Sequence, residues 1–250
     1  MSVYLTLTRR ELSAFFLSLS GYVTIAAVVL LMGQSFWGTL VQLQGAATDR
    51  PVTQLYYATP YFWFVLLLAG PAITMRLFAL EKFTGTFETL MTTPVGDLQV
   101  VLAKFTAAMI FYLLMWAPSL AGMLALRSYI TNVEAFDPGL LGSTFLGILL
   151  LGSLFISLGC FASALTRNQI TAAMISCALG FSLFLVSVLA DSSLAPAGWV
   201  GDVLSQVAMI DHMQDFARGI VDTRHVVFYV TLTFLFLFLT LRVVESRRWK

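Results

Sequence analysis

The chain has 250 residues, of which 59% are hydrophobic and 11% are charged, and its formal net charge is +1. Ordinary soluble domains carry roughly 25% charged residues, and a single soluble core of this size does not hide so much apolar surface. The composition therefore predicts an integral membrane protein, and the small net charge gives no reason to expect nucleic-acid binding.

Six segments are apolar over the roughly 20 residues that a helix needs to cross a membrane. They are apolar without interruption, not alternating, which predicts helices instead of a β-barrel. The fold class we expect is an all-α integral membrane protein with six transmembrane helices. The predicted spans cover residues 15–33, 57–75, 100–126, 140–165, 170–190 and 226–243.

The segment before the first span, residues 2–14, contains Arg9 and Arg10. We predict a short helix lying along the cytoplasmic surface, with a frayed polar tail as the alternative. The apolar run that follows is longer than that of a secretory signal, and no small-x-small cleavage site follows it before Trp37. An uncleaved first span is therefore expected.

The distribution of basic residues predicts the orientation. Six spans place both termini on one side, and ten of the fourteen Lys and Arg residues fall on that side. Cytoplasmic loops carry the excess of Lys and Arg, so both termini and the loop between spans two and three are predicted to be cytoplasmic. The localisation expected is the bacterial cytoplasmic membrane.

The cytoplasmic loop after the second span contains an amphipathic pattern. Its apolar residues recur at helical spacing in one stripe: Phe83, Phe87, Leu90 and Met91. Glu81, Lys82 and Glu88 fall elsewhere around the helix, on its wet or partner-facing side. Gly85 permits close approach of a partner but weakens the helix, and Pro94 ends it. We predict a helix over residues 81–94 that serves as a docking surface; a helix that merely shields the bundle is the alternative.

The longest polar stretch on the outer side covers residues 191–225. Val203, Val207, Ile210, Gln214 and Ala217 recur at helical spacing, which indicates a short amphipathic helix. It is expected either to dip into the outer leaflet or to cap the bundle as a solvated helix. Small residues in the fourth and fifth spans, such as Gly152 and Gly159, indicate close helix packing within the chain or, as the alternative, a contact between two copies.

The sequence lacks the usual catalytic and metal-binding motifs. It has two histidines, His212 and His225, and contains no HExxH, no Cys/His cluster, no GxSxG and no phosphate-binding P-loop. We therefore expect a non-enzymatic subunit with no catalytic residue, no metal site and no cofactor of its own. If ATP powers it, the ATP and magnesium bind to another subunit. Lys104 lies near the cytoplasmic edge of its span and is expected to snorkel to the surface.

The loop resembles the ABC-2 family of ATP-binding-cassette exporter permeases. That family's pattern is a Glu followed by a basic residue, then Gly-Thr-x-Glu-x-Leu, then a Pro. Here it reads Glu81-Lys82, Gly85-Thr86-Phe87-Glu88-Thr89-Leu90 and Pro94. The Gly-Lys that often enters the next span is Ala103-Lys104 in this chain. A second similarity, around His212, Phe216, Arg218, Gly219 and Asp222, is to the branch of gliding-motility-associated and nitrous-oxide-reductase accessory permeases.

The resemblance implies a type V exporter-like permease that couples ATP hydrolysis by a separate ATPase to export or to conformational signalling. Residues 81–94 would be the coupling helix in a groove of the ATPase, with Glu81, Lys82, Gly85, Thr86, Glu88, Leu90 and Pro94 as its docking residues. The N-terminal segment would be an elbow helix. His212, Phe216, Arg218, Gly219 and Asp222 would shape an outer gate or contact an outer partner.

The implied assembly is a homodimer of permeases with two cytoplasmic ATPase subunits, surrounded by membrane lipid. A membrane-anchored protein with a large extracytoplasmic domain accompanies the permease in the gliding-motility group. A scaffold or mechanotransmitter without a substrate of its own, serving such an outer partner, is the alternative function. Few polar residues line the spans, which mildly favours a lipid-like cargo over a hydrophilic ion.

Overall fold

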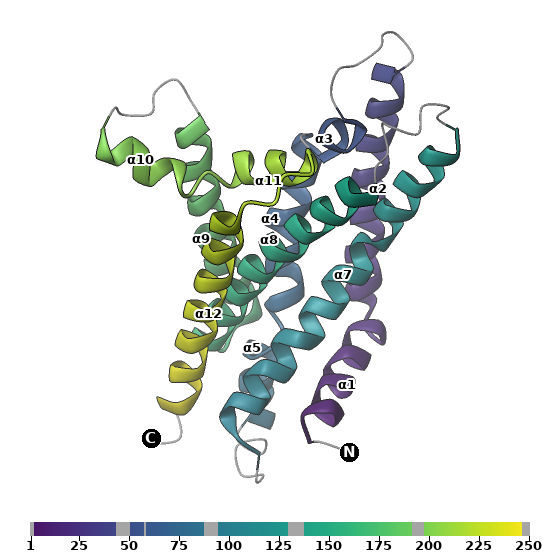
Figure 1. Cartoon of the computed structure of the whole chain (residues 1–250). Coiled ribbons are helices and arrows are strands. Elements are labelled where there is room, and N and C mark those ends of the chain that lie inside the picture. Colours follow the sequence, from purple (N-terminus) through teal and green to yellow (C-terminus); the bar gives the residue numbers. More distant parts are fainter. Residues whose placement is uncertain are drawn as a thin grey trace.

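A computed structural model describes residues 3–43, 51–57, 59–87, 95–129, 138–191 and 198–246. These residues form helices joined by short turns, and the described part contains no strand. The helices are α1 (Val3–Phe16), α2 (Leu19–Leu43), α3 (Val52–Tyr57), α4 (Pro60–Thr74), α5 (Ala79–Thr84), α7 (Asp97–Tyr129), α8 (Pro138–Leu165), α9 (Gln169–Asp191), α10 (Trp199–Ser205), α11 (Met209–Ala217) and α12 (Thr223–Ser246). Figure 1 shows the long helices side by side in one bundle.

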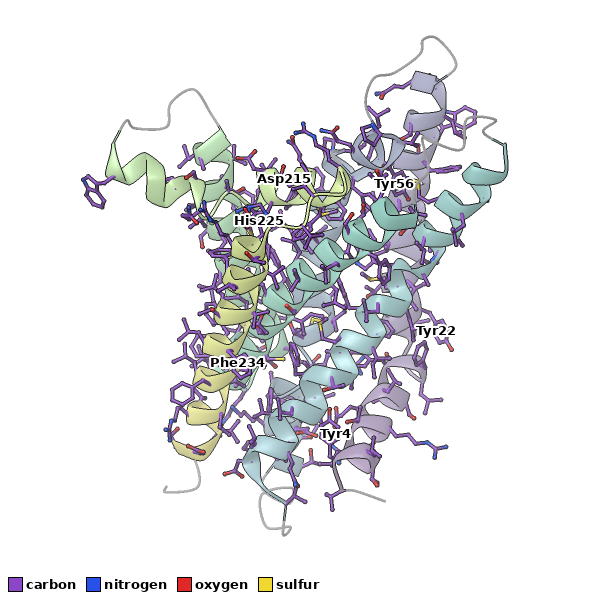
Figure 2. All side chains as sticks on the ribbon, in the orientation of Figure 1. Tyr4, Tyr22, Tyr56, Asp215, His225 and Phe234 are labelled. Carbon is purple, nitrogen blue, oxygen red and sulfur yellow. The ribbon has the colours of Figure 1, made fainter. Side chains whose placement is uncertain are left out.

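Six stretches are long and apolar enough to cross a membrane, which confirms the predicted all-α fold with six spans. They are α2, the stretch from α4 to the end of α5, α7, α8, α9 and α12. The start of α1 and the end of α12 lie at the same end of the bundle (Figure 1). Figure 2 places Tyr4 at this end and Tyr56, Asp215 and His225 toward the opposite end. We call these the terminal end and the opposite end.

Helix α8 is the centre of the bundle. It packs against α4, α7, α9, α11 and α12, and most of its side chains are buried, whereas few of those of α12 are buried. Its glycines make this close approach possible. A Cβ atom on Gly152 would lie 2.1 Å from the ring of Tyr112 in α7, and one on Gly159 would lie 2.0 Å from Thr74 Oγ1 in α4. At these two positions the small residues pack within the chain.

Helix α1 packs along α7 at the terminal end. The rings of Phe15 and Phe111 stack with centroids 4.8 Å apart, and the hydroxyl groups of Tyr4 and Thr106 lie 2.7 Å apart. The N-terminal segment is thus a defined helix and not a frayed tail. The chain leaves helical geometry at Leu17 and Ser18, so α2 begins at Leu19 and Phe15 belongs to α1, not to the first span.

The turn between α1 and α2 requires a glycine. The amide of Gly21 donates to Ser18 Oγ over 3.2 Å, so the Ser18 side chain caps the start of α2. A Cβ atom on Gly21 would lie 2.3 Å from the carbonyl oxygen of Phe15. Any other residue would therefore push α1 and α2 apart.

Helix α4 contains Pro71 and is followed by a turn from Met75 to Phe78 that leads into α5. Because proline lacks an amide hydrogen, it donates no hydrogen bond to the helix and weakens α4 one turn before its end. The last turn of α4 nevertheless remains helical, because the backbone amide of Met75 donates to the carbonyl of Pro71 over 2.9 Å. The polar segment after α4 therefore begins at a weakened point of the span.

Candidate functional site

The turn between α4 and α5 is attached to the terminal end of α8 by Ser163. The backbone amides of Phe78 and Ala79 each donate to Ser163 Oγ over 3.1 Å, and this hydroxyl donates to the carbonyl of Met75 over 3.3 Å. One buried side chain thus satisfies the backbone groups that a helix break leaves without partners. The turn and the end of α8 are held together as a result.

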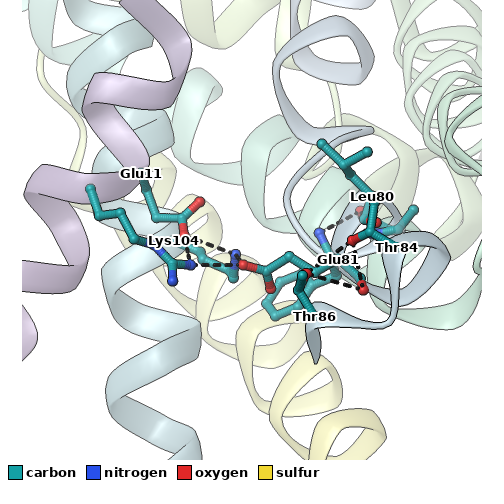
Figure 3. Close-up of polar contacts among 10 residues, drawn as sticks. Glu11, Leu80, Glu81, Thr84, Thr86 and Lys104 are labelled. Atoms are coloured by element: carbon teal, nitrogen blue, oxygen red, sulfur yellow. Dashed lines mark hydrogen bonds and ion pairs between the residues drawn. The ribbon is translucent and has the colours of Figure 1, made fainter. Parts of the chain in front are cut away.

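Helix α5 then contributes Glu81 to an ion cluster with Arg10, Glu11 and Lys104 (Figure 3). Glu81 Oε1 lies 2.8 Å from Arg10 Nη2 and 3.0 Å from Lys104 Nζ. Glu11 Oε1 lies 2.6 Å from Arg10 Nη2 and 3.1 Å from Lys104 Nζ. The two carboxylates and two cations are balanced, and they connect α5 to both α1 and α7.

Lys104 is the most buried member of the cluster, with only 2% of its side chain exposed. Its Nζ also lies 5.4 Å from the centre of the Phe78 ring, within the range of a cation–π interaction. The expectation that Lys104 snorkels to the surface is therefore wrong. Two carboxylates on α1 and α5 solvate the charge inside the protein in place of water.

The cluster also acts on Arg10 at its edge. Partial burial alone would lower the pKa of Arg10, but the hydrogen bonds and charges of Glu11 and Glu81 raise it above its ordinary value. The guanidinium group therefore stays charged, which keeps the cluster intact at any physiological pH.

Lys82, the next residue of α5, is held by a different helix. It is buried, its ammonium group donates to the carbonyl of Ala164 near the end of α8, and it lies 5.3 Å from the ring centre of Phe87. A cation at this position is favoured by the partial negative charge of a helix C-terminus. Neighbouring residues of α5 are thus anchored on opposite sides, Glu81 to α1 and α7 and Lys82 to α8.

The end of α5 is defined by Gly85. Its φ of 75° lies in the left-handed region that glycine adopts readily at a helix C-terminus. The helix predicted over residues 81–94 is therefore interrupted after Thr84, and the chain is helical again at Thr86 and Phe87. Thr84 and Thr86 bridge the break, with their hydroxyl oxygens 2.9 Å apart.

The two sides of this segment differ from the predicted ones. Lys82 and Phe87 are buried, whereas Phe83 is 75% exposed and does not belong to a buried apolar stripe. Gly85 and Thr86 are exposed. The remaining predicted docking residues, Glu88, Leu90 and Pro94, lie outside the described residues. The exposed surface of this segment therefore includes Phe83, Gly85 and Thr86.

The predicted outer site is organised by α11. His212 and Phe216 are buried, and the carbonyl of Phe216 accepts hydrogen bonds from Ser143 Oγ at 2.8 Å and Thr144 Oγ1 at 3.4 Å. A Cβ atom on Gly147 of α8 would lie 2.8 Å from the Phe216 ring. Helix α11 is thus a cap on the bundle, with Phe216 as its anchor on α8.

The residues after α11 shape the return into the last span. Arg218 and Gly219 are exposed, and Gly219 has a φ of 88° that favours glycine. Asp222 Oδ1 accepts a hydrogen bond from the amide of Arg224 over 2.8 Å, which caps the start of α12. Asp222 therefore has a local role in ending the turn. Among the residues predicted to shape an outer gate or contact an outer partner, Arg218 and Gly219 are the exposed ones.

The rings of His212 and His225 are stacked with centroids 3.9 Å apart, and His212 Nδ1 lies 3.2 Å from the hydroxyl of Tyr229. Burial is the main reason that the pKa of His212 is lowered to about 4; His225 lowers it further, and Asp222 opposes both. The imidazole is therefore neutral in the folded protein at neutral pH.

This lowered pKa predicts a pH dependence of stability. Between pH 6.5 and about pH 4 the unfolded chain binds a proton at His212 that the folded protein does not bind, so stability should fall as pH drops through this window. His212→Gln should flatten that fall, even if it lowers stability at every pH. The measurement is the melting temperature of both proteins from pH 7.5 to pH 4.5. An equal slope in the two proteins would contradict the assignment.

Three residues that hold α5 and the turn before it in place were not identified as its partners from the sequence. Glu11 and Ser163 lie far along the chain from α5, and no local pattern marks their contacts with it. Lys104 was noticed only as a charge near the edge of a span. The one available signal was that a Lys inside a span needs a carboxylate partner.

The described residues contain no group of three or more His, Cys, Asp or Glu placed to hold a metal ion. The site is instead a junction at which α5 is paired with groups on α1, α7 and α8, and its tip is exposed. A comparison with curated proteins gives no match. The model of the ABC-2 family transporter proteins matches residues 41–243. Since this match covers most of the chain, the protein belongs to the ABC-2 family of transporters, whose members are in general non-catalytic transmembrane subunits.

Proposed function

We propose that this chain is the permease that converts ATP binding and hydrolysis by a separate ATPase into movement of its own helices. Membership of the ABC-2 family implies a cytoplasmic ABC ATPase as partner. The observation that carries the proposal is the double anchoring of α5: Glu81 pairs with groups on α1 and α7, and Lys82 with the end of α8. The tip that follows, including Phe83 and Thr86, is exposed.

This geometry supports transmission of force. A partner that displaces the tip of α5 also displaces charges that are paired with three other helices. Breaking buried ion pairs is costly, so the helices follow α5 instead of releasing it. ATP binding and hydrolysis in the partner then bias the bundle between two arrangements that differ in their contacts with it.

The roles of the predicted docking residues divide accordingly. Glu81 and Lys82 transmit the movement inside the permease, while Gly85 and Thr86 contact the ATPase together with Glu88, Leu90 and Pro94. Phe83 joins this contact surface, because an exposed aromatic side chain is a typical anchor of a protein interface.

The test is co-purification of the ABC ATPase with variants of the tagged full-length chain. Phe83→Ser and Glu88→Lys should each weaken ATPase binding at least tenfold, the loss that roughly 2 kcal/mol from a central interface residue produces. The melting temperature of the permease should stay unchanged. The matched control is Leu165→Ser, an exposed apolar residue of α8 at the same end. Undiminished co-purification of both variants, or equal loss in the control, would refute the docking surface.

The assembly follows from the same proposal. Two permease copies pair as a homodimer and bind two ATPases in the bacterial cytoplasmic membrane, with both termini cytoplasmic. An outer companion with a large extracytoplasmic domain binds near α10 and α11, where Trp199 is exposed. The gliding-motility and nitrous-oxide accessory branch, suggested by the segment from His212 to Asp222, is part of this proposal.

The second candidate function is a mechanotransmitter without a substrate of its own. It is favoured by the filled interior of the bundle, where Phe62, Tyr112 and Trp116 are fully buried and meet one another. Vesicles that contain the permease and its ATPase distinguish the two functions. ATP-dependent movement of a lipid-like cargo supports export, whereas ATP hydrolysis without any translocation supports signalling to an outer protein.

A further inference from the structure

A cavity of about 160 Å³ lies at the terminal end beneath the turn between α1 and α2. Side chains of α1, the α4–α5 turn, α5 and α7 line it. One part of its wall is charged and includes Arg10 and Arg76, and another part is apolar and includes Phe15, Leu77 and Leu80. A ligand that fits this cavity has both a charged and an apolar portion.

The cavity lies where the protein surface changes from apolar to charged. The turn above it exposes Leu17 by 87% and Leu19 by 81%, which is favourable only if hydrocarbon surrounds this level of the molecule. Arg10 is seven residues earlier on α1, or roughly 10 Å along a helix. Charged residues at that distance from a hydrocarbon boundary are at the level of lipid head groups.

The positive charge of the cavity is not balanced by its carboxylates. Arg10 and Lys104 are neutralised by Glu11 and Glu81 within the ion cluster. Arg76 donates to the hydroxyl of Ser20, and no ion pair among the described residues includes it. A guanidinium group has five N–H donors, so Arg76 retains donors for an anion.

We propose that this cavity binds the phosphate group of an anionic membrane phospholipid, with Arg76 as the main donor. Arginine pairs with phosphate through two parallel hydrogen bonds, and the apolar wall accommodates the first methylene groups of an acyl chain. The exposed leucines of the α1–α2 turn then continue the apolar path into the bilayer. A free phosphate would gain only the charge, and a lipid without a phosphate only the apolar wall. The site goes beyond the proposed coupling function and does not depend on an ATPase.

The experiment compares ligands on the purified full-length chain in detergent by thermal shift and native mass spectrometry. Phosphatidylglycerol should bind on the order of tenfold more tightly than diacylglycerol with the same acyl chains, which lacks the phosphate; the difference is the gain from about one charge-assisted hydrogen bond. Inorganic phosphate and glycerol phosphate, at the same concentrations, should neither raise the melting temperature nor displace the lipid.

Two variants locate the site. Arg76→Gln should abolish the preference for phosphatidylglycerol, whereas Arg167→Gln, an exposed arginine in the α8–α9 turn at the same end, should keep it. Ala14→Leu fills the cavity next to its apolar wall without changing any charge, and it should also weaken phosphatidylglycerol binding. This variant tests the site even if Arg76→Gln fails to fold. The proposal is overturned if phosphatidylglycerol binds both cavity variants as it binds the unmodified chain. It is also overturned if Arg167→Gln loses as much binding, or if soluble phosphates bind equally well.

Discussion

Lys104→Met is expected to destabilise the folded protein by about 3–5 kcal/mol, the usual effect of removing one partner from a buried ion pair. The change leaves Glu11 and Glu81 facing each other with Arg10 as their only described cation. Their mutual repulsion should separate α5 from α1 and α7. The measurement is the loss of folded protein in a denaturant or temperature series, in detergent of fixed composition.

Two further variants show whether charge balance is the cause. Adding Glu81→Gln to Lys104→Met restores balance, because Arg10 and Glu11 remain as a pair, so the double variant should be more stable than the single one. Arg242→Met breaks an ion pair with Glu245 that is 63% and 35% exposed, and it should cost at most about 1 kcal/mol. Equal effects of Lys104→Met and Arg242→Met, or no recovery in the double variant, would contradict the structural role of the cluster.

Gly159→Ala should be the most disruptive single-carbon change in the bundle centre. The new Cβ atom would lie 2.0 Å from Thr74 Oγ1 and 2.6 Å from Thr74 Cβ, and a Cβ atom is fixed to its backbone. Overpacking a core costs about 1–3 kcal/mol when neighbouring side chains can shift. Here α4 itself must move away from α8, so we expect a cost at or above the upper end of that range, measured by the same unfolding series.

The same helix supplies the control for this prediction. Gly142 of α8 has no atom within 4 Å of the position of an added Cβ, so Gly142→Ala should be neutral or stabilise the helix by up to about 1 kcal/mol. Combining Gly159→Ala with Thr74→Gly removes the clash and should recover part of the loss. A Gly159→Ala protein as stable as the Gly142→Ala protein would show that α4 and α8 do not approach this closely.

The fold could be predicted because lipid imposes a simple rule on sequence. Long apolar runs separated by polar turns must be helices, and six such runs predicted the six described stretches that are long and apolar enough to cross a membrane. The boundaries depend on local contacts that composition does not show. The first span was predicted to start at Phe15, but Ser18 and Gly21 form a turn there. Likewise the third span was predicted to end at residue 126, but α7 continues through Pro118 to Tyr129.

The candidate site was predictable in place but less so in detail. The glycine motif and charges of the loop predicted a specialised segment after the second span, and in the structure Glu81 and Lys82 of that segment contact α1, α7 and α8. Helical periodicity then predicted Phe83 and Phe87 on one apolar stripe and Lys82 on the wet or partner-facing side, whereas Phe83 is exposed and both Phe87 and Lys82 are buried. Periodicity assumes one continuous helix, and the left-handed Gly85 breaks that assumption. The partners of Glu81 and Lys82 come from α1, α7 and α8, and no local pattern reports such distant contacts.

The position of Pro71 has a consequence for how α4 deforms. Because Pro71 gives no amide hydrogen to the preceding turn, bending α4 at this level breaks fewer hydrogen bonds than bending it at other levels. A bend at this level would move the chain from Pro71 to Thr84 as one short arm relative to the first part of α4. Ser163 and Ala164 tie that arm to α8, so the lower tip of the central helix swings with it.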